Sequence, residues 1–265
     1  MKRLTLLAIL AAPPAMAQNM VDCVLEPASR LTVTSSVDGV IREIPVRRGD
    51  MVEEGDLLYR LDSEIEELQL ELSRTRAESD VDVRAQQTRL ELRQREYERV
   101  EELSNRNVAA SAALDDASIE LALTELALEQ SEFDRKLAAI EVRQAEALLE
   151  RRSVRSPVSG LVVAVEATVG EYAAEQAAIM EIIETDPVHV EVFAPGELFG
   201  HIGVGDLYQV DLNPPLQGQF EGEVVIVDRF LDAASGTFGI QLSVSNPESK
   251  VPTGARCRID FGPRG

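Results

Sequence analysis

The sequence predicts a multi-domain α+β protein in which a long antiparallel helical hairpin interrupts a small β-domain and a small antiparallel β-barrel follows. All 16 Gly and all 12 Pro lie outside residues 63–152, so this block is predicted to be helical. A short motif occurs on both sides of the block, and short alternating strands begin at residue 187. The predicted segments are a signal peptide (1–17), an N-terminal segment (18–30), a first β-half (31–62), the hairpin (63–152), a second β-half (153–186) and the barrel (187–265).

The chain is strongly acidic. Among its 265 residues, 47 are Asp or Glu and 26 are Lys or Arg, which gives a formal net charge of -21. Proteins that bind nucleic acid draw their affinity from basic side chains, so the composition argues against a nucleic-acid partner. It also disfavours broad contact with anionic lipid. With 7 Phe, 4 Tyr and no Trp, the chain has few side chains from which to build an aromatic ligand pocket.

The N-terminus has the layout of a secretory signal peptide. A basic start precedes an apolar run over residues 4–12 and a small-residue cleavage site at residues 15–17. No later apolar run is long enough to span a membrane, so we expect a soluble periplasmic protein after cleavage. Cys23 raises the alternative of a lipid anchor, which the preceding Asp22 disfavours.

Cys23 and Cys257 are the two cysteines of the chain. An oxidising compartment allows them to form a disulfide. Cys257 also fits the inward side of a strand, where it would be a small buried apolar residue. The spacing in the sequence does not decide between a disulfide and two unlinked thiols.

The second half of the helical block contains two apolar seams. The first follows alternating steps of three and four residues, as in a coiled coil, through Leu114, Ala117, Leu121, Thr124, Leu128, Ser131, Arg135, Ala138, Val142, Ala145 and Leu149. Two seams on one helix indicate more than one neighbour. The second seam runs through Ile119, Leu123, Leu126, Gln130, Phe133, Leu137 and Ile140.

The first half of the block is more polar but keeps a helical pattern. A turn-like cluster at residues 104–107 divides the block into two arms that fold back on each other. The phase of the first arm slips near residues 79–83, as a stutter would cause. The apolar positions of this arm are Ile65, Leu68 and Leu72, then Val83, Gln86, Leu90, Tyr97 and Val100.

A repeat with a constant offset of 121 residues flanks the hairpin. Residues 37–41 (VDGVI) correspond to residues 158–162 (VSGLV), since 158 minus 37 is 121. In both copies a Gly followed by an acidic residue comes ten residues after the first Gly, at residues 49–50 and 170–171. Two half-sheets that each lack a complete core would close on each other.

Five short alternating runs follow the second half. Turn-forming Gly, Pro, Asn and Ser residues separate them, which is typical of a small antiparallel barrel. One helical turn is expected near residues 197–202. The runs cover residues 188–192, 208–212, 222–227, 238–242 and 256–261.

These motifs resemble the split biotinyl/lipoyl-like domain of HlyD-type periplasmic adaptor proteins, also called membrane fusion proteins. The resemblance rests on residues 39–41, 46–52, 55–58 and 155–160, and on the point at which the hairpin is inserted. It implies an efflux-pump adaptor that joins an inner-membrane transporter to a TolC-type outer-membrane channel, with six subunits in a ring. It also implies that the membrane-proximal domain of many family members is absent or reduced here.

The class of transporter is a separate question. An adaptor of a type I secretion system, which works with an ABC exporter, usually has an N-terminal membrane helix. Because the sequence predicts no such helix, a resistance-nodulation-division (RND) transporter is the favoured partner and an ABC-type exporter is the alternative. A secreted coiled-coil scaffold unrelated to transport is the competing function.

The resemblance also implies a channel-contacting pattern at the hairpin tip, formed by Arg, then Leu four residues later, then Ser seven residues after that. Arg99 and Leu103 match the pattern, whereas Ala110 takes the Ser position and Ser111 follows it. A guanidinium can pair with carbonyl or carboxylate oxygens of a partner, and a leucine can fill an intermeshing seam. The alternative is an ordinary surface arginine beside a core leucine.

The sequence indicates neither an enzyme nor a cofactor carrier. A biotin or lipoyl carrier needs a lysine at the turn between its halves, but the lysines are Lys2, Lys136 and Lys250. His189 and His201 have no Cys, Asp or Glu at metal-binding spacing, so we interpret them as structural and expect no metal or other cofactor. Motifs for phosphate binding or nucleophilic catalysis are missing from the sequence.

Overall fold

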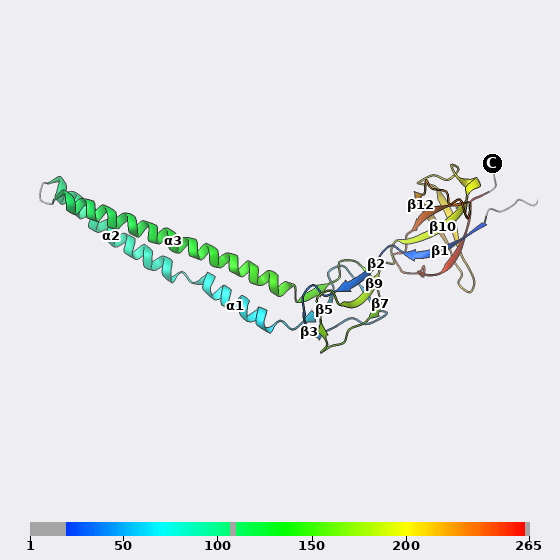
Figure 1. Cartoon of the computed structure of the whole chain (residues 1–265), viewed down its shortest axis with the longest axis horizontal. Coiled ribbons are helices and arrows are strands. Elements are labelled where there is room, and N and C mark those ends of the chain that lie inside the picture. Colours follow the sequence, from blue (N-terminus) through cyan, green and yellow to red (C-terminus); the bar gives the residue numbers. More distant parts are fainter. Residues whose placement is uncertain (1–19, 107–109, 263–265) are drawn as a thin grey trace, which may run out of the picture.

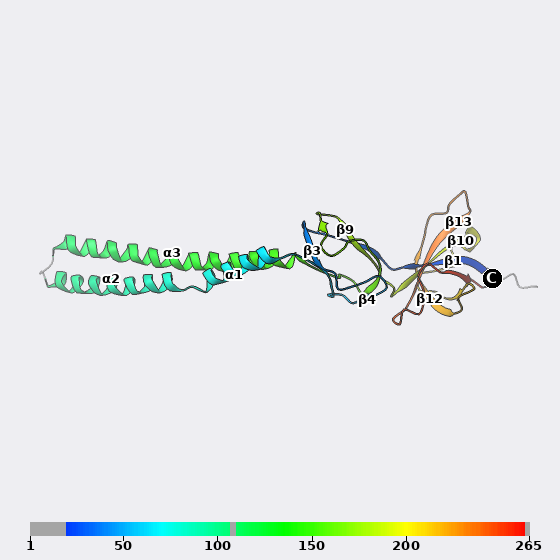
Figure 2. The same cartoon turned by 90° about the horizontal axis from the view of Figure 1, so that it is seen from below.

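The computed structural model describes residues 20–106 and 110–262. In this part of the chain three units follow one another along a long axis (Figure 1). The helical hairpin forms one end, the split β-domain lies in the middle and the β-barrel forms the other end, and a view from a perpendicular direction shows the same order (Figure 2). The predicted signal peptide and Asn107 of the predicted turn lie outside the described residues.

The hairpin consists of α1 (Glu64–Glu78), α2 (Val81–Asn105) and α3 (Ser111–Glu150). α3 packs against both helices of the first arm, and its 40 residues give it a length of about 60 Å. The predicted first seam of α3 is confirmed, because all its residues except Arg135 are buried or half-buried against the first arm.

The first arm is broken at Ser79 and Asp80, where a continuous helix with a stutter was expected. Ser79 adopts an extended conformation with φ -71° and ψ 121°. From the N-cap Ser63 onward, the buried or half-buried residues of the first segment of this arm follow the steps 63, 66, 70, 73 and 77. An unbroken continuation would bring Gln87, Glu91, Gln94 and Glu98 into the interface. The break shifts the phase, so the half-buried or buried residues of α2 are Val83, Gln86, Leu90, Arg93, Glu96, Tyr97, Val100 and Ser104.

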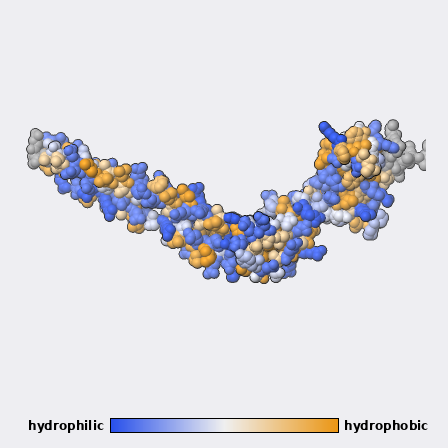
Figure 3. Space-filling model, viewed as in Figure 1, coloured by the Kyte–Doolittle hydropathy of each residue, from blue (hydrophilic) through white to orange (hydrophobic). Residues whose placement is uncertain are grey.

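The helix face that was expected to be buried at the start of this arm is the wrong one. Ile65, Leu68 and Leu72 are exposed, whereas Leu70 and Ser73 are buried against α3. Apolar side chains therefore remain on the outer surface of the hairpin, and Figure 3 shows orange areas along its length.

The β-domain consists of two four-stranded sheets that share one core. Each half of the repeat gives two strands to each sheet, and the sheet orders are β2-β9-β7-β4 and β6-β5-β3-β8. The core contains Leu58, Tyr59, Leu61, Val162, Ile179 and Ile182, among other apolar residues. The strands are β2 (Arg30–Thr34), β3 (Gly39–Glu43), β4 (Met51–Val52), β5 (Leu57–Leu61), β6 (Ser153–Arg155), β7 (Gly160–Val165), β8 (Tyr172–Ala173) and β9 (Ala178–Ile183).

The two halves are related by an approximate two-fold symmetry that follows the offset of 121 residues. The amide of Gly49 donates to the carbonyl of Val162, and the amide of Gly170 donates in the same way to the carbonyl of Ile41, both at 2.8 Å. Gly49 and Gly170 both have a positive φ, 96° and 89°, which a residue with a side chain rarely adopts. The halves therefore exchange equivalent hydrogen bonds and complete each other.

The β-barrel is closed by six strands in the order β1-β10-β13-β12-β11-β14. Its first strand comes from the N-terminal segment, so the barrel is not confined to residues 187–265 as expected. β1 pairs with both β10 and β14 and closes the barrel. The expected helical turn is a short 3-10 helix at Gly196–Leu198. The strands are β1 (Met20–Pro27), β10 (Val188–Pro195), β11 (Leu207–Leu212), β12 (Gln219–Val227), β13 (Thr237–Val244) and β14 (Arg256–Asp260).

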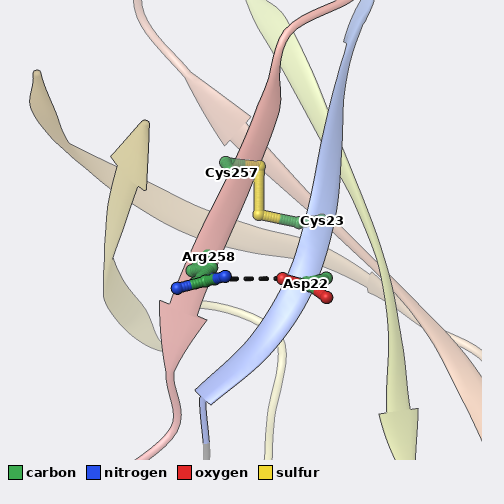
Figure 4. Close-up of a disulfide and its surroundings, with 4 residues drawn as sticks. All are labelled: Asp22, Cys23, Cys257 and Arg258. Atoms are coloured by element: carbon green, nitrogen blue, oxygen red, sulfur yellow. Dashed lines mark hydrogen bonds and ion pairs between the residues drawn. A yellow bond between two sulfur atoms is a disulfide. The ribbon is translucent and has the colours of Figure 1, made fainter. Parts of the chain in front are cut away.

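Cys23 and Cys257 face each other across β1 and β14 and form a disulfide (Figure 4). Their Cα atoms lie 4.8 Å apart, and both side chains belong to the barrel core. Beside the disulfide, Nε of Arg258 donates to Oδ1 of Asp22 at 3.1 Å. The first and last strands of the described residues are thus joined covalently.

Candidate partner-binding site at the hairpin tip

The tip lies between the end of α2 and the start of α3, at the end of the hairpin farthest from the β-domain (Figure 1). Arg99 is exposed and lies two residues after Tyr97, whose side chain is turned toward α3, so Arg99 points away from the interface. Leu103 is four residues farther along on the same side of α2, and 39% of it is exposed. A partner can therefore reach both side chains.

Ser111 is the first residue of α3 and is exposed on the other arm. Ala110, which takes the Ser position of the family pattern, is the N-cap residue of α3, and no side chain caps that helix end. Arg99 and Leu103 thus share a helix face, whereas Ser111 lies across the turn. Of the three expected tip residues, two form one surface and the third belongs to a different helix.

The two sides of the tip differ in charge. In the first part of α3, residues 111–134 include seven acidic residues and no Lys or Arg. Residues 81–105 of α2 include five Arg and six acidic residues. Arg106 pairs with Glu102 at the end of α2, and Arg93 lies 3.5 Å from Glu120 of α3. The hydrogen bond and charge of Glu96, together with the charge of Glu120, raise the pKa of Arg93 above its usual value.

A second set of contacts joins the base of the hairpin to the β-domain. Nη2 of Arg152 lies 2.5 Å from Oε1 of Glu66 in α1, and Nη1 donates to the carbonyl of Asp38 at 2.8 Å. Arg151 donates to the carbonyl of Ser36 at 2.9 Å. The two arginines therefore connect the end of the hairpin, the start of α1 and the loop before β3.

Tyr172 of β8 also binds the loop before β3. The hydroxyl of Tyr172 donates to Oδ2 of Asp38 at 2.6 Å. This hydrogen bond lowers the pKa of Asp38 and raises the pKa of Tyr172, because it favours a carboxylate beside a protonated phenol. Sequence reasoning missed this joint, although a pair of arginines directly after a long helix is a signal that could have marked it.

The two histidines and the acidic side chains do not gather into a candidate metal centre in the described part of the chain. Within residues 20–106 and 110–262, no group of three or more His, Cys, Asp or Glu side chains could hold a metal ion. His189 is half-buried in β10 and His201 is exposed after the 3-10 helix, so the two lie on different elements. None of the helices in the described ranges is long and apolar enough to cross a membrane.

The chain is a membrane fusion protein, or adaptor. The feature that defines this class is a β-domain of two equivalent halves, with a helical hairpin inserted at one end and a closed barrel attached at the other. The chain belongs to the family with a CzcB-like, barrel-sandwich hybrid domain, whose model matches residues 29–184. This family assignment agrees with the resemblance inferred from the repeat and confirms the predicted fold class.

Curated relatives support the same family. The chain is 28% identical over 230 residues to the nodulation protein NolF of Rhizobium meliloti, with 87% of this chain and 59% of NolF covered. It is 24% identical over 231 residues to the cobalt-zinc-cadmium resistance protein CzcB of Cupriavidus metallidurans, with 87% and 42% covered. The chain thus spans about half the length of the curated relatives that it matches.

Solved structures show the same fold. The structure of MacA from Actinobacillus actinomycetemcomitans matches with a TM-score of 0.77 at 19% identity, covering 92% of this chain and 79% of MacA. The membrane fusion protein Spr0693 from Streptococcus pneumoniae matches with a TM-score of 0.63 at 16% identity, covering 93% and 99%.

Proposed function

We propose that this chain is the periplasmic adaptor subunit of a tripartite efflux system, in which it joins an inner-membrane transporter of the RND type to a TolC-type outer-membrane channel. The observation that carries the proposal is the linear arrangement of hairpin, β-domain and barrel, which holds an exposed helical tip far from the barrel (Figure 1). Such a chain can bind one partner at each end without binding the exported compound. The subunits would associate into a ring, with six members by resemblance to the family.

The curated relatives support transport as the setting. The relatives include a cobalt-zinc-cadmium resistance protein and a multidrug resistance protein, MdtA of Photorhabdus laumondii. An ABC-type exporter is the alternative transporter.

The tip is proposed to contact the channel through Arg99 and Leu103, with Ser111 contributing from the other arm. In cells that lack the chromosomal gene, we expect the wild-type chain to restore efflux and to co-purify with a transporter and a channel. We expect the Arg99→Asp/Leu103→Asp variant to lose the channel but keep the transporter. Arg143→Asp makes the same kind of charge change near the other end of the hairpin and should keep both partners.

The outcomes separate the competing functions. Unchanged efflux after deletion of the gene would instead favour a coiled-coil scaffold unrelated to transport. Recovery of an ABC-type exporter in place of an RND transporter would identify the alternative partner. Full recovery of the channel with the Arg99→Asp/Leu103→Asp variant would refute the tip assignment.

A further inference from the structure

A narrow joint connects the barrel to the β-domain, and two segments of the chain pass through it (Figures 1 and 2). Residues 28–29 join β1 to β2, and residues 184–187 join β9 to β10. In the described part of the chain, no strand of the barrel pairs with a strand of the β-domain. The orientation of the two units relative to each other therefore depends on how this joint is held.

The longer of the two segments contains a bulge. Residues 28–29 face residues 184–187 between the last strand pair of the barrel and the first strand pair of the β-domain. Both backbone groups of Glu184 form hydrogen bonds with the shorter segment, at 3.0 and 3.1 Å, so the ladder continues through this residue. Residues 185–187 are left over, and they bulge out of the ladder.

Asn246 binds this bulge from the barrel. It lies in the loop between β13 and β14, and only 2% of it is exposed. Its Nδ2 donates to the carbonyl of Thr185 at 2.8 Å, and its backbone amide donates to Oδ1 of Asp186 at 2.7 Å. One residue of the barrel thus holds two consecutive residues of the bulge.

Asn246 is itself fixed to the barrel. Its Nδ2 also donates to the carbonyl of Val251 at 3.1 Å, and its Oδ1 accepts from the amide of Val251 at 2.8 Å. Val251 belongs to the barrel core. Farther along the same loop, the amide of Gly254 donates to the carbonyl of Leu25 in β1 at 2.6 Å. The loop is therefore attached to the barrel on both sides, and Asn246 connects it to the joint.

Burial makes these hydrogen bonds hard to exchange. Asn246 uses both donors and the acceptor of its side chain, and a buried polar network with every member satisfied is rigid. Thr185 is 8% exposed, so water does not readily replace its partner. The contacts at the base of the hairpin are more open to water, because Tyr172 is 60% exposed and Arg151 is also exposed. The joint at the barrel is thus held by the drier set of contacts.

We propose that Asn246 is a positioning residue that locks the bulge and thereby holds the barrel and the β-domain as one rigid body. The inference goes beyond the proposed function, because it concerns the isolated chain and not its partners. If the proposed function also holds, a movement of the partner at the barrel is passed directly to the β-domain that carries the hairpin.

Spin-label distance measurements on the purified full-length chain test the lock. Both cysteines of the chain are bonded to each other, so the labels attach only to introduced cysteines. Arg42→Cys in β3 and Glu223→Cys in β12 place exposed labels in the two units. We expect a distance distribution as narrow as that of the reference pair Thr32→Cys/Arg42→Cys, which lies within the β-domain. A much broader distribution for the pair across the joint would overturn the proposal.

Adding Asn246→Ala should broaden the distribution across the joint and leave the reference pair unchanged. Asn213→Ala is the matched control. Asn213 also lies in the barrel, directly after β11, and its side chain forms no hydrogen bond within the described residues. This variant should keep the narrow distribution. Equal broadening by both variants would overturn the proposal, because only Asn246 contacts the bulge.

A second pair of variants tests the same lock from the bulge. Asp186→Ala removes the oxygen that accepts from the backbone amide of Asn246, and should broaden the distribution. Asp186→Asn keeps that oxygen and should leave the distribution narrow. Asp186 is exposed, so this comparison is available even if Asn246→Ala does not fold. Broadening of the same size by Asp186→Asn and Asp186→Ala would contradict the lock.

A purely structural role of Asn246 gives a different result. If the residue only stabilised the barrel, Asn246→Ala would lower the melting temperature and leave the distances in the folded chain unchanged, which would overturn the proposal. The outcome is also separate from the proposed function. A rigid joint in a chain whose gene can be deleted without any change in efflux would leave the lock standing and refute the adaptor function.

Discussion

Gly39 and Gly160 occupy equivalent positions in the two halves of the β-domain, but a methyl group would meet different obstacles at the two sites. A Cβ at Gly160 would lie 2.3 Å from the backbone oxygen of Ile183, whereas a Cβ at Gly39 would lie 2.8 Å from Nη1 of Arg152. A backbone oxygen within a paired strand cannot move away easily. The guanidinium of Arg152 can shift more easily, although its hydrogen bond to Asp38 and its ion pair with Glu66 oppose the movement.

The first prediction follows from this difference. Gly160→Ala should destabilise the β-domain by about 1–3 kcal/mol through overpacking, and Gly39→Ala should cost less than Gly160→Ala. Urea unfolding followed by tyrosine fluorescence compares the two variants, because one of the four tyrosines, Tyr59, is fully buried in the core that both halves share. Equal losses in the two variants would show that the obstacle at Gly160 relaxes as easily as the one at Gly39.

The ion pair Arg152–Glu66 at the base of the hairpin should stabilise the fold more than the ion pair Arg74–Glu146 farther along the hairpin. The side chains of Arg152 and Glu66 are 22% and 17% exposed, whereas those of Arg74 and Glu146 are 53% and 46% exposed. Arg152→Ala removes a half-buried charge and its hydrogen bond to Asp38, so we expect a loss of about 1–3 kcal/mol. Arg74→Ala is the matched control and should cost less than about 1 kcal/mol.

Far-UV circular dichroism during thermal unfolding measures both arginine variants through the helical signal. The Arg152 interpretation would be contradicted if the two variants unfolded at the same temperature.

The break in the first arm should be repairable. Residues 77 and 83 both face α3, and six positions separate them where a coiled coil needs seven. Insertion of one Leu between Ser79 and Asp80 would restore the spacing and place the new side chain in the seam. We expect more helix and a melting temperature higher by about 2–4 °C for each kcal/mol gained. Insertion of Leu-Ala at the same place keeps the added Leu but misplaces α2, and should lower both values.

Reduction should weaken the barrel. The Cys23–Cys257 disulfide joins residues 234 positions apart, so it restricts the unfolded chain strongly. We expect Cys23→Ser/Cys257→Ser to lose about 2–5 kcal/mol of stability. Dithiothreitol should lower the melting temperature of the wild-type chain and leave that of the double variant unchanged. A wild-type chain that melts at the same temperature with and without reductant would refute this role.

Much of the fold was predictable because its signals are local or repeated. The absence of Gly and Pro over residues 63–152 predicted the hairpin, and the offset of 121 residues predicted two equivalent β-halves. The steps of three and four residues placed Ser131 and Ala145 in the interface of α3, where both are buried. In each case a regular spacing is tied directly to a helix face or to a strand pair.

Two features could not be predicted from local patterns. Ile65, Leu68 and Leu72 form the most apolar stripe of α1. The apolar periodicity therefore predicted that this outer face is buried, whereas the buried face is the more polar one that contains Ser73. The pairing of β1 with β14 joins Met20 to Asp260, and no local pattern reports a contact over that separation. The tip residues were selected only through a family pattern, and their role stays a prediction. Arg99 and Leu103 share a face because they lie four positions apart on one helix.

The approximate two-fold symmetry of the β-domain has a consequence for how such chains can change. The hairpin leaves the domain after Leu61 and returns at Ser153, and the equivalent points of the other half are Ile182 and Thr32, where the chain leads to and from the barrel. The domain is therefore a connector with two equivalent attachment points, one for the hairpin and the other for the barrel. Either part can be lengthened, shortened or exchanged during evolution while the connector and its internal bonding stay the same.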